Sequence, residues 1–108
     1  MGKGSSGAST TDGRTNARVL ILTSLAAGPK HGYAMVTDIK EFSGTQLGPG
    51  TLYTALQRLE EDGLIAAVSS DDRRRPYRIT PAGLTALRAH AADLTRVTTT
   101  VGKRLAAR

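Results

Sequence analysis

The chain has 108 residues, of which 39% are apolar, with three Tyr, one Phe and no Trp. This length makes one small domain, or one domain with a helical appendage. Such a chain buries only part of its surface when it folds alone, so we expect an oligomer. Fifteen Lys and Arg against nine Asp and Glu give a formal net charge of +6, and most of the cations are Arg. This excess indicates an anionic partner such as nucleic acid.

Several classes of protein are excluded by composition. The chain has no Cys, which excludes disulfides, catalytic thiols and cysteine-ligated metals. No apolar run approaches the ~20 residues of a membrane span. The N-terminus also lacks the apolar segment of a signal peptide. We therefore expect a soluble, cytoplasmic protein.

The N-terminal third predicts a leader and two helices. Residues 1–13 are rich in Gly, Ser and Thr, which is typical of a disordered leader. From Asn16, the stretch ARVLILTSLAAG is apolar nearly all round and predicts a buried helix that ends at Gly28-Pro29. HGYAMVTDIKEFSG predicts a second helix that ends at Ser43-Gly44. One side of it would carry Met35, Val36, Ile39 and Phe42.

A third helix is predicted from GPGTLYTALQRLEEDGLI, from about Pro49 to Asp62, with Gly63 as its C-cap. At 100° per residue, one side belongs to the core and carries Leu52, Ala55, Leu56 and Leu59. The opposite side carries small and polar residues, namely Gly50, Thr54 and Gln57. Thr51 and Arg58 lie on one flank of that side, and Tyr53 lies on the other.

The outer side of this helix suits DNA. Small and hydroxyl residues at the start allow the helix N-terminus, with its free N–H groups and positive dipole end, to approach a phosphate. Gln57 and Arg58 have the reach and the donors to read base edges. The acidic run 60–62 would point out of a groove. The same sequence can also be an ordinary amphipathic helix with a Pro start and a Gly stop.

Two short segments, LIAAVSS and PYRIT, have strand character, and the DDRRR between them is wholly polar. Three helices followed by a hairpin is the order of a winged helix-turn-helix, whose third helix enters the major groove. Arg73, Arg74 and Arg75 would then contact the adjacent minor groove or backbone from the tip of the wing. The alternative is a solvated loop, which Asp71 and Asp72 favour.

A last helix begins with Thr80 as N-cap and Pro81 at the first helical position. It runs nearly to the end of the chain, and its seam positions alternate in steps of three and four as Leu84, Leu87, Ala91, Leu94, Thr98, Val101 and Leu105. Thr98 and the TTT run weaken the seam, and Gly102 costs helix stability. Because the seam is too long for one small core to cover, it indicates a second copy of the chain.

Four motifs resemble those of the PadR family of bacterial transcriptional regulators, in the same order and at the right spacing. They are His31-Gly32-Tyr33, Gly50-Thr51-Leu52-Tyr53, LQRLEEDGLI at 56–65 and RPYRITPAG at 75–83. The resemblance covers about residues 17–85. The length resembles the short subfamily, which ends in a single C-terminal helix.

The resemblance implies a mainly helical winged helix-turn-helix with a small β-hairpin over residues 14–80, then a dimerisation helix over 81–108. It implies a homodimeric repressor that binds a partly palindromic double-stranded DNA operator, without a cofactor. Tyr53 would contact a phosphate. Lys30, His31 and Tyr33 would begin the second helix and face the DNA backbone. Tyr33 and Tyr77 can instead simply pack the domain.

In such regulators the C-terminal helices make most of the dimer, and the first helix contributes. The implied interface contains Val19, Leu22, Leu84, Leu87, Ala91, Leu94, Val101 and Leu105. Some members respond to phenolic acids or planar, hydrophobic drugs bound near the dimer axis. A pocket of that kind would be lined by Leu87, Ala91 and Leu94, which can equally be plain interface. Drug-binding short members can use a Trp on the last helix, and this chain has no Trp.

Two other classes of function have weaker support in the sequence. An enzyme needs a catalytic constellation, but His31 and His90 lie in different predicted elements, and no triad, phosphate loop or metal-ligand pattern is found. We therefore expect no enzymatic activity. A winged helix can also serve protein–protein or RNA contacts. Salt dependence and sequence preference separate that alternative from operator binding.

Overall fold

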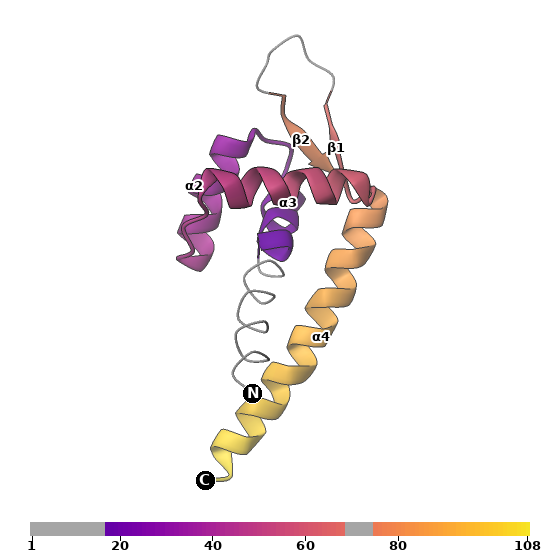
Figure 1. The fold of residues 1–108 in the computed structure, drawn as a ribbon. Helices are drawn as coiled ribbons and strands as arrows, with labels where there is room; N and C mark the ends of the chain where they lie inside the picture. Colours follow the sequence, from indigo (N-terminus) through magenta and orange to yellow (C-terminus); the bar gives the residue numbers. More distant parts are fainter. Residues whose placement is uncertain (1–16, 69–74) are drawn as a thin grey trace, which may run out of the picture.

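The computed structural model describes residues 17–68 and 75–108. The described elements are an N-terminal helix (17–26), α2 (Gly32–Ser43), α3 (Pro49–Glu61), β1 (Ile65–Ala67), β2 (Tyr77–Ile79) and α4 (Pro81–Ala106). The first helices and the hairpin form a head, from which α4 extends as a long arm (Figure 1). The predicted fold class, a winged helix-turn-helix with a long last helix, is confirmed. The predicted leader, 1–13, and the wing residues Arg73 and Arg74 lie outside the described residues.

The core lies where the helices of the head meet β1. Its fully buried side chains come from each of these elements and include Ile21, Leu25, Met35, Ile39, Leu56, Leu59 and Ile65. In α2, Met35 and Ile39 face this core as expected, and Val36 is half-buried. Phe42, which was expected on the same side, is exposed. The last turn of α2, residues 40–43, is wholly exposed.

Helix α3 has the two faces that its sequence predicts. Leu52, Ala55, Leu56 and Leu59 are buried, whereas Gly50, Thr54 and Gln57 are exposed. After the helix, the Gly63 N–H donates to the Glu60 carbonyl and the Leu64 N–H to the Leu59 carbonyl, both at 3.0 Å. These two bonds form a Schellman motif, and Gly63 adopts the left-handed φ of 75° that the motif requires. The chain therefore leaves α3 in a fixed direction.

The hairpin is antiparallel, with Ile65 opposite Ile79 and Ala67 opposite Tyr77. Both predicted strands are confirmed, although they are shorter than the two sequence segments. A further pairing was not predicted. The Lys30 N–H donates to the Tyr77 carbonyl at 3.1 Å, and the Tyr77 N–H donates to the Lys30 carbonyl at 3.0 Å. The segment before α2 is thereby attached to the wing.

Helix α4 begins as predicted, with Thr80 as N-cap and Pro81 in the first turn. Leu87 packs partly against the core, whereas every residue from 91 to 108 is exposed. The helix nevertheless continues unbroken through the TTT run and Gly102. Among residues 17–68 and 75–108, no helix has both the length and the apolar character needed to cross a membrane.

Candidate nucleic-acid interface

The start of α2, the middle of α3 and the base of the wing surround a hollow of about 390 Å³. We call it the wing hollow, and its lining is His31, Gly32, Tyr33, Ala34, Tyr53, Arg75 and Tyr77. His31, Tyr33, Tyr53 and Arg75 were expected to contact DNA from three separate sequence motifs. The structure brings these four residues together.

The wing hollow depends on a close approach of α2 to α3. A Cβ atom at Gly32 would lie 3.3 Å from Leu52 Cδ2 and 3.9 Å from the Tyr53 hydroxyl oxygen. The Tyr33 and Tyr53 side chains are 81% and 61% exposed, so both rings are accessible to a partner. Two phenol groups that can donate or accept hydrogen bonds thus line the same hollow as Arg75.

The N-terminus of α2 opens on the same hollow. His31 is its N-cap residue and makes no side-chain hydrogen bond to the helix. The first turn contains no acidic residue. Uncovered N–H groups at a helix start favour an anion. His31 itself is half-buried, and its Nδ1 atom is covered. This nitrogen is therefore not accessible to a partner.

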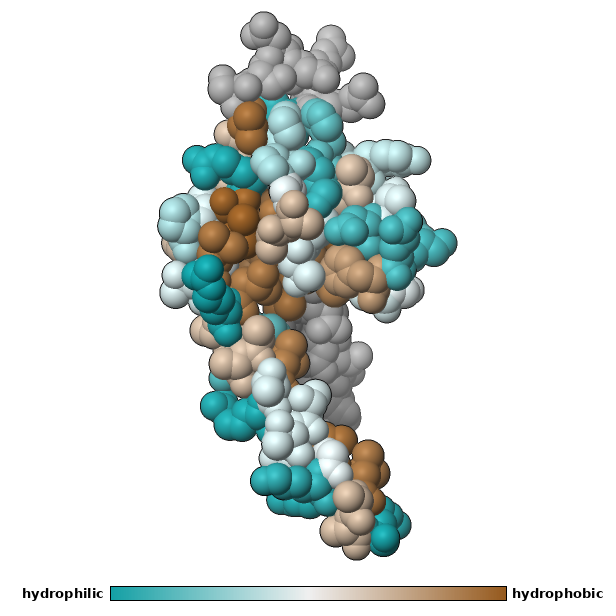
Figure 2. Space-filling view, turned by 180° about the vertical axis from the view of Figure 1, so that it is seen from behind, coloured by the Kyte–Doolittle hydropathy of each residue, from teal (hydrophilic) through white to brown (hydrophobic). Residues whose placement is uncertain are grey.

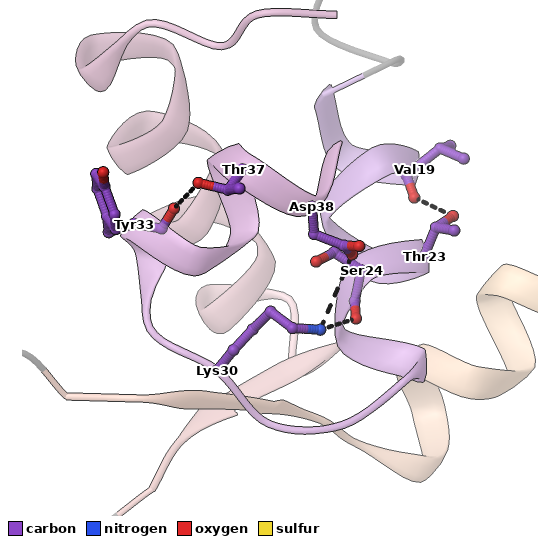
Figure 3. A network of polar contacts seen from close by, with 7 residues as sticks. All are labelled: Val19, Thr23, Ser24, Lys30, Tyr33, Thr37 and Asp38. Atoms are coloured by element: carbon purple, nitrogen blue, oxygen red, sulfur yellow. Dashed lines mark hydrogen bonds and ion pairs between the residues drawn. The ribbon is translucent and has the colours of Figure 1, made fainter. Parts of the chain in front are cut away.

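Lys30 differs from its expected role of facing the DNA backbone. Its ammonium donates to the Ser24 carbonyl and lies 3.9 Å from the Asp38 carboxylate. Figure 3 shows the side chain directed between the N-terminal helix and α2, while Tyr33 points away from this network. Because only 20% of the Lys30 side chain is exposed, the residue connects the first two helices instead.

On the opposite flank of α3, a second hollow of about 290 Å³ lies between α3 and the N-terminal helix. We call it the helix hollow, and its lining is Ala17, Arg18, Gly50, Thr51, Thr54, Ala55 and Arg58. It gathers four of the residues expected to contact DNA, all from α3.

Arg18 was missed by the sequence reasoning because it stands within an apolar run that reads as a buried helix. Its guanidinium donates to the Asp62 carboxylate at 3.1 Å, at the C-cap of α3. Both side chains are partly exposed, so the pair contributes under about 1 kcal/mol to stability. Its effect is to hold a second cation beside Arg58.

Gln57 belongs to neither lining and is exposed on the outer face of α3. Its amide makes one long contact, 3.4 Å, with the Glu61 carboxylate one turn later. A hydrogen bond of that length is weak, so the amide can turn toward a partner.

Residues 21–89 match the sequence profile of the transcriptional regulator PadR-like family. The chain belongs to this family. The family resemblance that the four motifs carry is therefore confirmed, and this PadR-like protein is a winged-helix transcriptional regulator. Membership in a family of regulators is also in line with the expectation that the chain is not an enzyme.

Relatives of the chain include proteins named as transcriptional regulators. The chain is 43% identical over 77 residues to the transcriptional regulator Rv3488 of Mycobacterium tuberculosis, a match that covers 68% of this chain and 71% of that protein. It is 46% identical over 85 residues to an uncharacterized 37.1 kDa protein in transposon TN4556 of Streptomyces fradiae. This match covers 78% of the chain but only 25% of the Streptomyces protein. The crystal structure of a PadR family transcriptional regulator from Eggerthella lenta has a TM-score of 0.72 at 30% identity, covering 95% of this chain and 94% of that one.

The residues expected at a dimer interface fall into three groups. Leu22 is 5% exposed and belongs to the core of the PadR-like chain itself, so of the two residues expected from the first helix only Val19 is accessible. Leu84 and Leu87 are half-buried. The exposed group lies along the arm and contains Ala91, Leu94, Val101 and Leu105.

The exposed apolar stripe of the arm also contains Val97, which the seam prediction missed. It stands three residues after Leu94 and four before Val101, so helical spacing puts it on the same side. Together with Leu105, these residues form what we call the arm stripe. Figure 2 shows brown, apolar side chains along one side of the free end of α4.

Proposed function

We propose that this PadR-like protein is a sequence-specific, homodimeric repressor that binds a partly palindromic DNA operator. Helix α3 would enter the major groove, and the Arg-rich wing would lie on the adjacent backbone or minor groove. The observation that carries this proposal is the wing hollow. There, Tyr33 of α2, Tyr53 of α3 and Arg75, just before β2, meet beside the exposed outer face of α3.

The two flanks of α3 suit the two strands of a duplex. A helix of about 10–12 Å diameter fills a major groove that is about 12 Å wide, so each flank of the helix faces one phosphate backbone. On one flank, the wing hollow offers two phenols, one guanidinium and the start of α2. On the other, the helix hollow offers the Arg18 guanidinium and the Thr51 hydroxyl. Both flanks therefore suit phosphate oxygens.

The outer face of α3 suits base edges. Its first turn contains Gly50 and Thr51 and no acidic residue, so the helix start can come close to the duplex. Gln57 and Arg58, two turns further along, carry the donors that recognise purine edges. Glu60 and Glu61 stand at the far end of the helix, where like-charge repulsion would keep that end away from the backbone.

The arm stripe supports the dimer. Leu94, Val97, Val101 and Leu105 are apolar and exposed, and a second α4 would cover them. A twofold dimer would place its recognition helices about 34 Å apart, one turn of DNA.

A hydrophobic or phenolic effector is the last part of the proposal. Ala91 and Leu94 are exposed and would line a pocket with Leu87 only after a second arm closes over them.

The test is fluorescence anisotropy of the purified protein with a duplex from upstream of its own gene, against a random duplex, at two salt concentrations. We expect tight, salt-sensitive binding to the first duplex and weaker binding to the second, because phosphate contacts weaken steeply with salt. Weak binding that is equal on both duplexes and insensitive to salt would contradict the proposal. An RNA of the same sequence tests the RNA alternative, and capture of a protein partner would then be the next experiment.

A further inference from the structure

We propose that the junction between the end of α3 and the start of α4 sets the half-site spacing that the dimer accepts. This rests on the proposed function, because spacing has a meaning only for a dimer on DNA. Two short segments form the junction. They are Gly63-Leu64, directly after the recognition helix, and Thr80 with Gly83, at the start of the arm.

Thr80 joins the two helices through hydrogen bonds. Its hydroxyl donates to the Gly63 carbonyl at 2.7 Å and accepts from the Gly83 N–H at 3.0 Å. Its own N–H donates to the Leu64 carbonyl at 3.0 Å. One residue thus binds the Schellman turn of α3 and caps α4. Any tilt of the arm relative to the recognition helix must break or bend at least one of these bonds.

Gly83 lets the two segments come this close. It is buried in the first turn of α4, and a Cβ atom there would lie 2.1 Å from the Leu64 carbonyl oxygen and 2.7 Å from Ile79 Cγ1. The Leu64 oxygen is backbone and is already held by Thr80, so it cannot give way as a flexible side chain would. A larger residue at Gly83 therefore fits only if the start of α4 moves. Glycine is otherwise unfavourable within a helix, which indicates that the close approach is its reason for being there.

The geometry turns a small tilt into a change of spacing. Helix α3 has 13 residues and is therefore about 20 Å long. If the arms are held together in a dimer, a tilt of about 10° at the junction moves the far, N-terminal end of α3 by about 3.5 Å. This is comparable with the rise of one base pair, ~3.4 Å. A fixed junction thus selects one spacing, and a tilted junction selects another.

The chain offers a matched control in the same helix. Gly102 is also a glycine within α4, but a Cβ atom there would meet nothing within 4 Å. Gly102→Ala changes the same atoms as Gly83→Ala without disturbing the junction. The chain also has no Cys, so introduced cysteines are the only sites for thiol labels.

The first experiment measures the junction itself. Glu60→Cys in α3 and Thr99→Cys in α4 are exposed positions for a pair of spin labels. Pulsed electron paramagnetic resonance on labelled protein, diluted with unlabelled protein, reports the distance within one chain. We expect Gly83→Ala to shift or broaden this distance and Gly102→Ala to leave it unchanged. An unchanged distance in folded Gly83→Ala protein would overturn the inference.

A second pair of variants decides the matter if Gly83→Ala fails to fold. Thr80→Val keeps the shape but removes the hydroxyl that bonds Gly63 and Gly83, so the distance should broaden. Thr80→Ser keeps the hydroxyl and should restore the original distance. Equal distances in both variants would overturn the inference.

The second experiment uses the operator from the anisotropy measurements, with its spacer lengthened or shortened by one or two base pairs. We expect Gly83→Ala to bind the original spacing on the order of tenfold more weakly, a size typical of coupling between sites, and to prefer another spacing. Its affinity for a single half-site should equal that of the unchanged protein. If the unchanged protein binds no DNA, the proposed function fails while the label distances still test the junction. If it binds and the variants keep its spacing preference, the inference alone fails.

Discussion

Lys30 and Tyr77 exchange two backbone hydrogen bonds, of 3.1 and 3.0 Å, although one precedes α2 and the other lies in β2. These bonds attach the start of α2 to the base of the wing. Tyr33 follows Lys30 closely in the sequence, and Arg75 closely precedes Tyr77. The positions of Tyr33 and Arg75 are therefore coupled through the same pairing. The wing hollow is therefore one structural unit and not a chance meeting of loops.

Base reading by α3 is tested with Gln57→Ala and Arg58→Ala. We expect each variant to lose discrimination between the operator and random duplex by about 1–3 kcal/mol, the range for a bidentate base contact. Anisotropy titrations on both duplexes measure this difference. Arg88→Ala, an exposed arginine on α4, is the charge-matched control and should keep the discrimination. Equal weakening on both duplexes would assign the residue to backbone contacts.

The Arg-rich wing is tested by changing Arg73, Arg74 and Arg75 together to Ala. Each phosphate contact that is lost should reduce the slope of log affinity against log salt by about 1, so the plot should flatten. The operator and random duplexes should be affected alike, because phosphates carry no sequence information. An unchanged slope would show that the run is a solvated loop.

The arm stripe is tested with Val101→Asp. A carboxylate within a covered apolar seam has no partner, so we expect the dimer to dissociate at micromolar concentration. Thr99→Asp adds the same charge away from the arm stripe and should remain dimeric. Sedimentation velocity separates the two states. A monomer for the unchanged protein at that concentration would contradict the dimer itself.

Lys30 is expected to act on stability and not on DNA. Lys30→Ala removes the ammonium that bonds the Ser24 carbonyl and faces Asp38, and hydrogen bonds of charged groups contribute about 1.5–3 kcal/mol. Denaturant unfolding should therefore show a loss of about 1–3 kcal/mol, whereas the salt slope of DNA binding should not change. Lys103→Ala, on the exposed arm, is the control for stability. A reduced salt slope for Lys30→Ala would return this residue to the DNA interface.

The elements that local sequence determines were predictable. The two faces of α3 follow from helical periodicity, and its end follows from Gly63, because glycine adopts the left-handed conformation without strain. The Thr80 cap was likewise predictable, because a hydroxyl residue before Pro is a local signal.

Side-chain directions that depend on distant parts of the chain were not predictable. Lys30, just before α2, pairs through its backbone with Tyr77, and nothing in the neighbouring sequence indicates this pairing. The inward direction of the Lys30 side chain was therefore not predictable. Leu22 was assigned to a dimer because an apolar helix does not reveal whether its partner is the same chain or another. Arg18 and its neighbours in the helix hollow come from two helices whose contact is set by tertiary packing alone.

The exposed arm has a consequence for how the protein responds to its own abundance. Residues 91–108 are all exposed, and three consecutive threonines and a glycine lower the helix propensity of this part of α4. We therefore expect the arm to become fully helical only when two copies meet, which a rise of helicity with concentration in circular dichroism would reveal. Below the dimer dissociation constant, operator occupancy would then increase with the square of protein concentration. For the proposed homodimeric repressor, the arm would make the protein a sensor of its own copy number, with repression beginning sharply as the chain accumulates.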